Sequence, residues 1–129
     1  MGIPGSAKPF VAIGCIAALL AVALGAFGAH ALKARIAPDL MSVYRTGVEY
    51  HFYHALGLIL VGLAASQLPD SAWLRGAGWA MLAGIALFSG SLYLLALTGQ
   101  RWLGAITPFG GLAFIAAWGL FAAAFMGKP

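Results

Sequence analysis

The chain carries very little charge. Of its 129 residues, 8% are Asp, Glu, Lys or Arg, and three are acidic. Between residues 76 and 127 the one charged residue is Arg101, which separates 25 uncharged residues from another 26. An apolar run of about 20 residues crosses a hydrocarbon layer of ~30 Å as a helix. The scarcity of charge therefore excludes an ordinary soluble domain and predicts a membrane protein.

Cysteine is equally scarce, since Cys15 is the single one. This excludes an internal disulfide and a CxxC metal or redox motif. The formal net charge of +4 could indicate a nucleic-acid partner, but the basic residues stand singly between apolar runs. They are Lys8, Lys33, Arg35, Arg45, Arg75, Arg101 and Lys128. Scattered basic residues are typical of membrane-interface anchors, so no nucleic acid is expected to bind.

The apolar residues, 63% of the chain, form four long runs. We expect helices over about 9–32, 42–67, 72–97 and 107–126. The first run resembles a secretory signal but is longer than a usual signal core, so we expect a retained helix. Short connections imply antiparallel neighbours. The sequence thus predicts one transmembrane domain over residues 1–129, an all-α integral membrane antiparallel four-helix bundle.

The second helix is the least apolar of the four. Asp39 or Ser42 is available to cap it, and Ser71 to cap the third helix. Its stretch free of charge and histidine, residues 55–69, spans only about 22 Å at helical rise, which is too short to cross a membrane. The helix must therefore include its preceding turns. This places Glu49 through His54 at the membrane boundary.

Small residues predict where helices pack closely. Ala21, Gly25 and Ala29 recur at every fourth position, with Gly28 beside them. Ser89, Gly90 and Ser91 form a second small group in the third helix. Because packing drives helix association in lipid, we expect both groups to face other helices, with the serine hydroxyls bonded to nearby carbonyls.

The expected topology gathers most polar side chains at one membrane face. This candidate polar cluster comprises His30, Arg45, Glu49, Tyr50, His51, Tyr53, His54 and Tyr93. His30 and at least one of His51 and His54 should share it, with tyrosines nearby. Arg45 and Glu49 stand four residues apart, which favours an ion pair. A proton-transfer or ligand-charge role for Glu49 is the alternative.

Catalytic, metal and cofactor roles find little support in this cluster. Glu49 points about 140° away from His54 around the helix, so the two cannot join His51 in a facial metal triad. No HExxH motif is present. No serine has a base and an oxyanion partner indicated by the sequence. We therefore expect no metal, no cofactor and no catalytic residue, and hydrogen-bonded histidines at the interface.

Four ordered motifs resemble a known family. They are Gly25 to Leu32 (GAFGAHAL), Tyr50 to Leu56 (YHFYHAL), Phe88 to Tyr93 (FSGSLY) with Leu97-Thr98-Gly99, and Ile106 to Gly111 (ITPFGG). Together they resemble the YgdD-like family of small membrane proteins, a domain of unknown function. The resemblance implies a four-helix, multi-pass protein of the bacterial inner membrane. It implies no reaction, cofactor or catalytic residue.

Three functional hypotheses follow. The first is a structural or accessory membrane protein, not an enzyme, that supports envelope integrity or a membrane complex. Its partners would be membrane lipids and either a second copy or another membrane protein. The second is a small transporter or proton-coupled carrier, against which stands the absence of an acid from Met1 to Pro38. The third is a lipid- or quinone-binding protein that uses the His/Tyr cluster, which would require a cleft beside His30 and His54.

Overall fold

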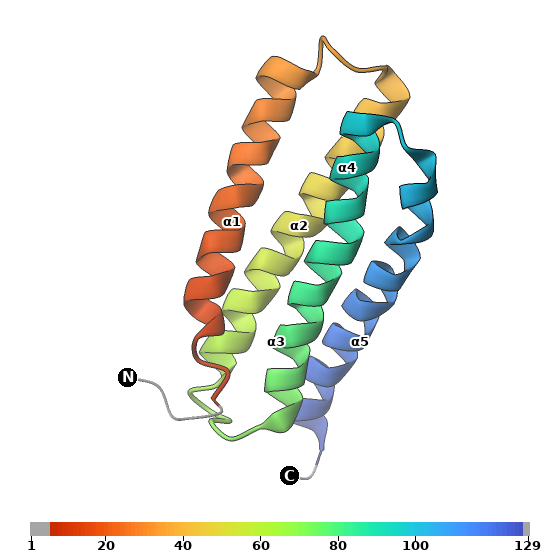
Figure 1. Cartoon of the computed structure of the whole chain (residues 1–129). Coiled ribbons are helices and arrows are strands. Elements are labelled where there is room, and N and C mark those ends of the chain that lie inside the picture. Colours follow the sequence, from red (N-terminus) through yellow and green to blue (C-terminus); the bar gives the residue numbers. More distant parts are fainter. Residues whose placement is uncertain (1–5, 128–129) are drawn as a thin grey trace.

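The computed structural model describes residues 6–127 and places four helices there, with no strand in that range. Lys128, one of the basic residues named above, lies outside it. The helical segments are α1 (Phe10–Phe27) with a π-helical turn (Gly28–Leu32), α2 (Pro38–Ala64), α3 (Ala72–Gly84) with a π-helical turn (Ile85–Ser89) into α4 (Gly90–Thr98), and a 3-10 turn (Arg101–Ala105) before α5 (Thr107–Met126). The segment from α3 to α4 is one continuous rod (Figure 1).

The second helix begins four residues earlier than the sequence suggested. Its N-cap is Ala37, which makes no side-chain capping bond, and Pro38 takes the first helical position. Proline fits there because the first helical N–H has no partner in the helix in any case. The expected caps Asp39 and Ser42 therefore lie inside the helix. Ser71 does cap α3, since its hydroxyl oxygen accepts a hydrogen bond from the Leu74 N–H at 3.2 Å.

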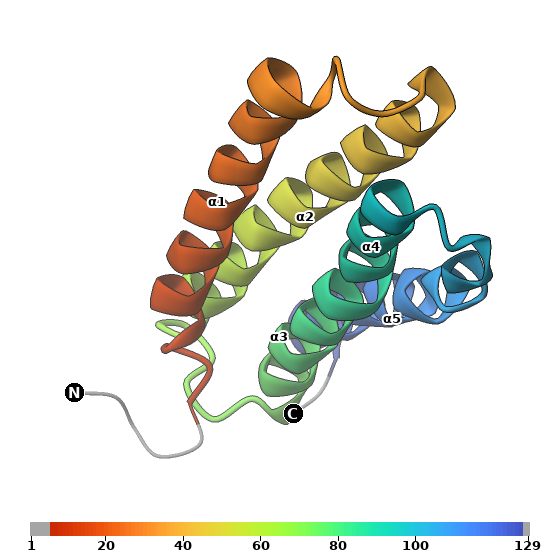
Figure 2. The same ribbon diagram turned by 45° about the horizontal axis from the view of Figure 1, so that its top comes forward.

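The helices stand side by side, and their connections alternate between the two ends of the molecule (Figure 1). Contacts join α1 to α2, α2 to α3 and α4, and α3 to α5. Figure 2 shows α1 and α5 on opposite sides of the central pair. α1 begins and α5 ends at the same end of the molecule, so polar connections are confined to the two ends.

Glycine and alanine bring α1 and α2 into close contact. A Cβ built on Gly14 would lie 2.7 Å from Ile59 and one on Gly25 3.4 Å from Val48, while Gly28 faces the Tyr44 ring. Early residues of α1 therefore contact late residues of α2, and late residues of α1 contact early residues of α2. This approach is possible only because these positions lack larger side chains.

The contact seam on α1 differs from the predicted stripe. Gly14, Ala21 and Gly28 are buried at seven-residue spacing, whereas Ala29 is exposed and Gly25 is half-buried. A stripe of every fourth residue rotates by about 40° per step around a helix, so it leaves the interface within two steps. The seven-residue spacing stays on the facing side. Ala29 was thus wrongly assigned to helix packing.

Three of the four helices are long and apolar enough to cross a membrane, namely Phe10–Leu32, Ala72–Thr98 and Arg101–Met126. Many large apolar side chains on them are exposed, including Leu19, Trp79 and Ile115. In water such a surface would be unfavourable, but in hydrocarbon it costs nothing. α2 does not reach the same hydropathy because it carries the polar groups described next. Its buried side, with Leu58 and Val61, packs into the core.

Candidate functional site: a histidine and aromatic centre

The two histidines of α2 lie at the middle of the helix, not near its start. His51 is the central residue of the 27-residue α2. Both His51 and His54 are 5% exposed. The sequence analysis expected them near the start of the helix, and the structure differs because α2 begins earlier, at Pro38.

His54 is held by three interactions that use both ring nitrogens. Its Nδ1 lies 2.8 Å from the backbone oxygen of Tyr50, and its Nε2 accepts a hydrogen bond from the indole N–H of Trp118 at 2.9 Å. The ring stacks on Phe114, with centroids 3.5 Å apart and planes 10° apart. An indole nitrogen only donates and a carbonyl only accepts, so His54 must be neutral with its proton on Nδ1.

His51 joins α2 to α4. Its Nδ1 lies 2.7 Å from the hydroxyl oxygen of Tyr93. The Tyr93 ring in turn lies 5.4 Å from the ring of Tyr44, centroid to centroid. The Tyr44 hydroxyl donates to the backbone oxygen of Leu24 on α1 at 2.5 Å. These side chains therefore link three helices through buried or half-buried polar contacts.

Serine hydroxyls extend this centre toward α5. Ser89 is fully buried, and its hydroxyl donates to the backbone oxygen of Gly47 at 2.7 Å. Ser91 pairs with the hydroxyl of Thr107 at 2.6 Å and donates to the backbone oxygen of Phe88 on its own helix. Gly90, between them, faces no other helix within 4 Å. The serines thus form interhelical bonds, while Gly90 is not part of a close seam.

The remaining members of the candidate polar cluster lie elsewhere. His30, in the π-helical turn after α1, is exposed and forms no hydrogen bond among residues 6–127. Gly28, two residues before it, faces Tyr44, which precedes His51 by seven residues or about 10 Å along α2 at helical rise. Tyr50 and Tyr53 are exposed in part, although the Tyr50 ring packs on Phe88 at 4.7 Å. The cluster therefore does not include His30.

The expected ion pair between Arg45 and Glu49 is not formed. Both side chains are exposed on α2. The ion pair found within the described range instead joins Arg101 to Asp39 at 3.1 Å, with the two side chains 72% and 62% exposed. The hydrogen bond from the Arg101 guanidinium lowers the pKa of the Asp39 carboxyl below its usual value. This pair connects the 3-10 turn to the first turn of α2.

This arrangement is suited to holding helices together. Every buried side-chain nitrogen or oxygen in the described part of the chain has a hydrogen-bond partner. No group of three His, Cys, Asp or Glu residues between 6 and 127 could hold a metal ion. A general base or a metal ligand needs a free nitrogen, and His54 has none. The centre as built therefore satisfies its own polar groups.

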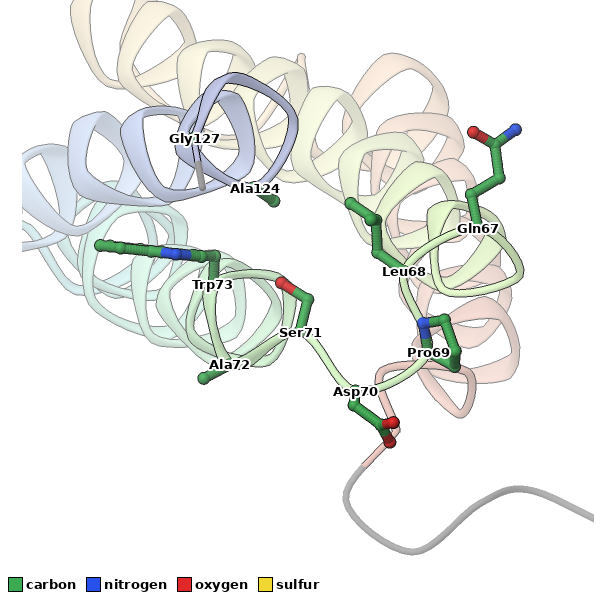
Figure 3. A pocket seen from close by; sticks show the side chains of 9 residues that line it. All are labelled: Gln67, Leu68, Pro69, Asp70, Ser71, Ala72, Trp73, Ala124 and Gly127. Atoms are coloured by element: carbon green, nitrogen blue, oxygen red, sulfur yellow. The ribbon is translucent and has the colours of Figure 1, made fainter. Parts of the chain in front are cut away.

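Two hollows lie away from these histidines. One, of about 560 Å³, lies where α2 ends, α3 begins and α5 ends (Figure 3). Its lining is Gln67, Leu68, Pro69, Asp70, Ser71, Ala72, Trp73, Ala124 and Gly127. Figure 3 shows the Asp70 carboxylate pointing away from Ala124. The other, of about 430 Å³, lies between α1 and α2.

Several residues of the centre could not be identified from the sequence. Trp118 and Phe114 stand one turn apart on α5 and so share a face, but nothing in the sequence shows that this face meets His54. Tyr44 and Thr107 were assigned no interhelical role. The one local signal is the bond from His54 to the carbonyl four residues earlier, which any helical histidine can form.

Comparison with known proteins finds a family of unknown function and relatives that are named membrane proteins. The family described as protein of unknown function (DUF423) matches residues 24–111. The UPF0382 membrane protein YwdK of Bacillus subtilis is 55% identical over 86% of this chain and 90% of its own length. A UPF0382 membrane protein of Staphylococcus haemolyticus is 47% identical over 86% of this chain and 89% of its own. No solved structure matches the chain. The chain therefore belongs to the DUF423 family, a family of small membrane proteins of unknown function.

Proposed function

We propose that this chain is a multi-pass protein of the bacterial inner (cytoplasmic) membrane, with a structural or accessory role in the envelope or in a membrane complex. The proposal has two further parts. The chain is an antiparallel four-helix bundle, and within its family it resembles the YgdD-like proteins. The antiparallel arrangement is supported by the contacts between α1 and α2, in which early residues of one helix face late residues of the other. The three apolar helices support insertion in a membrane.

The fourth crossing, by α2, is part of the proposal. A polar side chain in hydrocarbon is costly unless it faces the bundle interior and finds a partner. His51 and His54 meet this condition, since both are buried and bonded to Tyr93 and Trp118. α2 can therefore cross among its neighbours although its own hydropathy is low.

The main support for the accessory role is that both ring nitrogens of His54 are hydrogen-bonded within the protein. Both of its nitrogens are occupied, and a bound proton would displace the Trp118 N–H. A proton carrier or quinone site built on this histidine would need an imidazole nitrogen that can exchange a proton or bind the ligand. Neither hollow described above is lined by a histidine. The geometry thus favours a structural use of the histidines over transport or quinone binding.

The test compares function and assembly in the same preparation. Purified protein is reconstituted in liposomes, and proton flux is recorded with a trapped pH dye under an imposed gradient. The wild type should match empty liposomes, and His54→Ala should match His30→Ala, the control at an exposed histidine. Native mass spectrometry of gentle membrane extracts should show the chain bound to another protein or to a second copy. Proton flux that His54→Ala abolishes and His30→Ala leaves intact would contradict the proposal.

A further inference from the structure

One exposed face runs along almost the whole length of α2. Its side chains, all exposed, are Ser42, Arg45, Glu49, Tyr53, Leu56, Leu60 and Leu63. Successive members are three or four residues apart, so they lie within about 80° of one another around the helix. The buried His51 points to the opposite side. This spacing is that of a seam by which one helix packs along another, and we call it the α2 face.

The charged half of the α2 face lies deep along the helices. Val48 packs against Gly25, which is four residues from the centre of the apolar segment Phe10–Leu32. Glu49 therefore stands about 5 Å from that centre at helical rise, and Arg45 lies one turn nearer the end of the molecule. The inference rests on the crossing by α2 in the proposed function, which puts both side chains inside the ~30 Å hydrocarbon layer.

The charges of this face have no partner within the described chain. The ion pair found among residues 6–127 joins Arg101 to Asp39 and includes neither Arg45 nor Glu49. Charged side chains at such depth are unfavourable in lipid, so they face the interior of a bundle and pair with one another. The α2 face is on the outside of the single chain. It can therefore become interior only in an assembly.

We propose that the α2 face packs against the same face of a second copy, about a two-fold axis that runs along the helices. The face carries both signs of charge one turn apart, which makes it complementary to itself. The axis brings Arg45 of each copy to Glu49 of the other, so the same ion pair forms twice. Long side chains offset by about one turn meet in this way between parallel helices. Beyond them, Leu56, Leu60 and Leu63 meet their own copies.

Charge reversals expressed together in one membrane test this contact. Arg45→Glu gives the face two acids and Glu49→Arg two bases, so neither variant can pair with itself or within its own helix. Each alone should give at least about tenfold less dimer than the wild type in native mass spectrometry of gentle membrane extracts. The two together, tagged to differ in mass, should form the mixed dimer. Asp70→Arg, at an exposed acid beyond the end of α2, is the control and should dimerise as the wild type does.

Cross-linking tests the same contact in a chain whose charges are intact. In a Cys15→Ala chain, Leu60→Cys should form a disulfide-linked dimer on mild oxidation in membranes, because the two copies of this position lie side by side. Ile115→Cys is the matched control, since Ile115 is exposed on α5 and outside the α2 face. It should stay monomeric under the same conditions. Equal cross-linking at both positions would count against the proposal.

Two further results would overturn the dimer and leave the proposed function standing. One is a mixed dimer no more abundant than the dimer of either single variant. The other is a wild type that binds a different membrane protein in place of a second copy and loses it in Arg45→Glu. The α2 face would then be the docking site of that protein.

The crossing by α2 is tested separately. Ser42→Cys and Ser66→Cys, each in a Cys15→Ala chain, should react with an impermeant thiol reagent from opposite sides of the membrane. Reaction from the same side would refute the crossing, and the inference with it. Reaction from opposite sides together with a monomeric wild type would refute the dimer alone.

Discussion

The contact of Gly110 with the π-helical turn Ile85–Ser89 allows a sharp test of the packing. Gly110 of α5 lies against the backbone of Phe88 in the π-helical turn Ile85–Ser89, and a Cβ built on it would overlap the Phe88 backbone nitrogen and lie 2.7 Å from its Cα. Backbone atoms cannot move aside as a flexible side chain can, so α5 must shift in Gly110→Ala. Overpacking of this kind costs about 1–3 kcal/mol.

Gly119, on the same helix, provides the matched control. Nothing lies within 4 Å of a Cβ built there. Both substitutions gain the same helix preference of alanine over glycine, about 0.5–1 kcal/mol. The difference between the two variants therefore isolates the steric cost. Gly119→Ala should be as stable as the wild type or more so, and Gly110→Ala less stable than Gly119→Ala by that cost.

The assay is thermal unfolding in detergent, followed by the fluorescence of the four tryptophans. At about 4 °C per kcal/mol for a domain of this size, Gly110→Ala should melt about 4–12 °C below Gly119→Ala. Equal melting temperatures would show that α5 and the π-helical turn are not in backbone contact.

Three further outcomes are expected. Trp118→Phe should lower the free energy of unfolding by about 1–2 kcal/mol, since it removes the donor to His54 and keeps an aromatic ring; calorimetry checks this. Ser89→Ala should cost about 1 kcal/mol in the same assay, because one interhelical hydrogen bond is lost. The pair of Asp39 and Arg101 should stabilise above the ordinary carboxyl pKa of 3.8 and lose its effect as pH falls through the lowered folded-state pKa. The melting temperatures of wild type and Asp39→Asn should therefore converge at low pH and in high salt, and a gap that widens on acidification would contradict this.

The helical character of the chain could be predicted because its physical cause is local. Apolar runs of membrane length, broken at prolines, require backbone groups to bond within each helix. The start of α2 was missed because a proline at the first helical position and a following cap candidate give competing signals. The π-helical turns were not predictable from composition, since they depend on how the helices pack.

The partners within the centre could not be predicted for a related reason. The sequence orders residues along each helix but does not state which face of α5 turns toward α2. The contact of His54 with Trp118, which are 64 residues apart, depends on that rotation. Likewise, Arg101 pairs with Asp39 across 62 positions of the sequence, and no local spacing indicates this ion pair. Whether the remaining candidate residues serve a function stays a prediction.

His54 is a neutral imidazole with both ring nitrogens hydrogen-bonded inside a closed centre. Solid-state 15N NMR of histidine-labelled protein in bilayers at neutral pH measures this directly, with His54→Ala used to assign the signal. The spectra should show a protonated Nδ1, an unprotonated Nε2 and a close contact between that Nε2 and the indole N–H of Trp118. A protonated Nε2, in either the other neutral tautomer or the imidazolium, would contradict it.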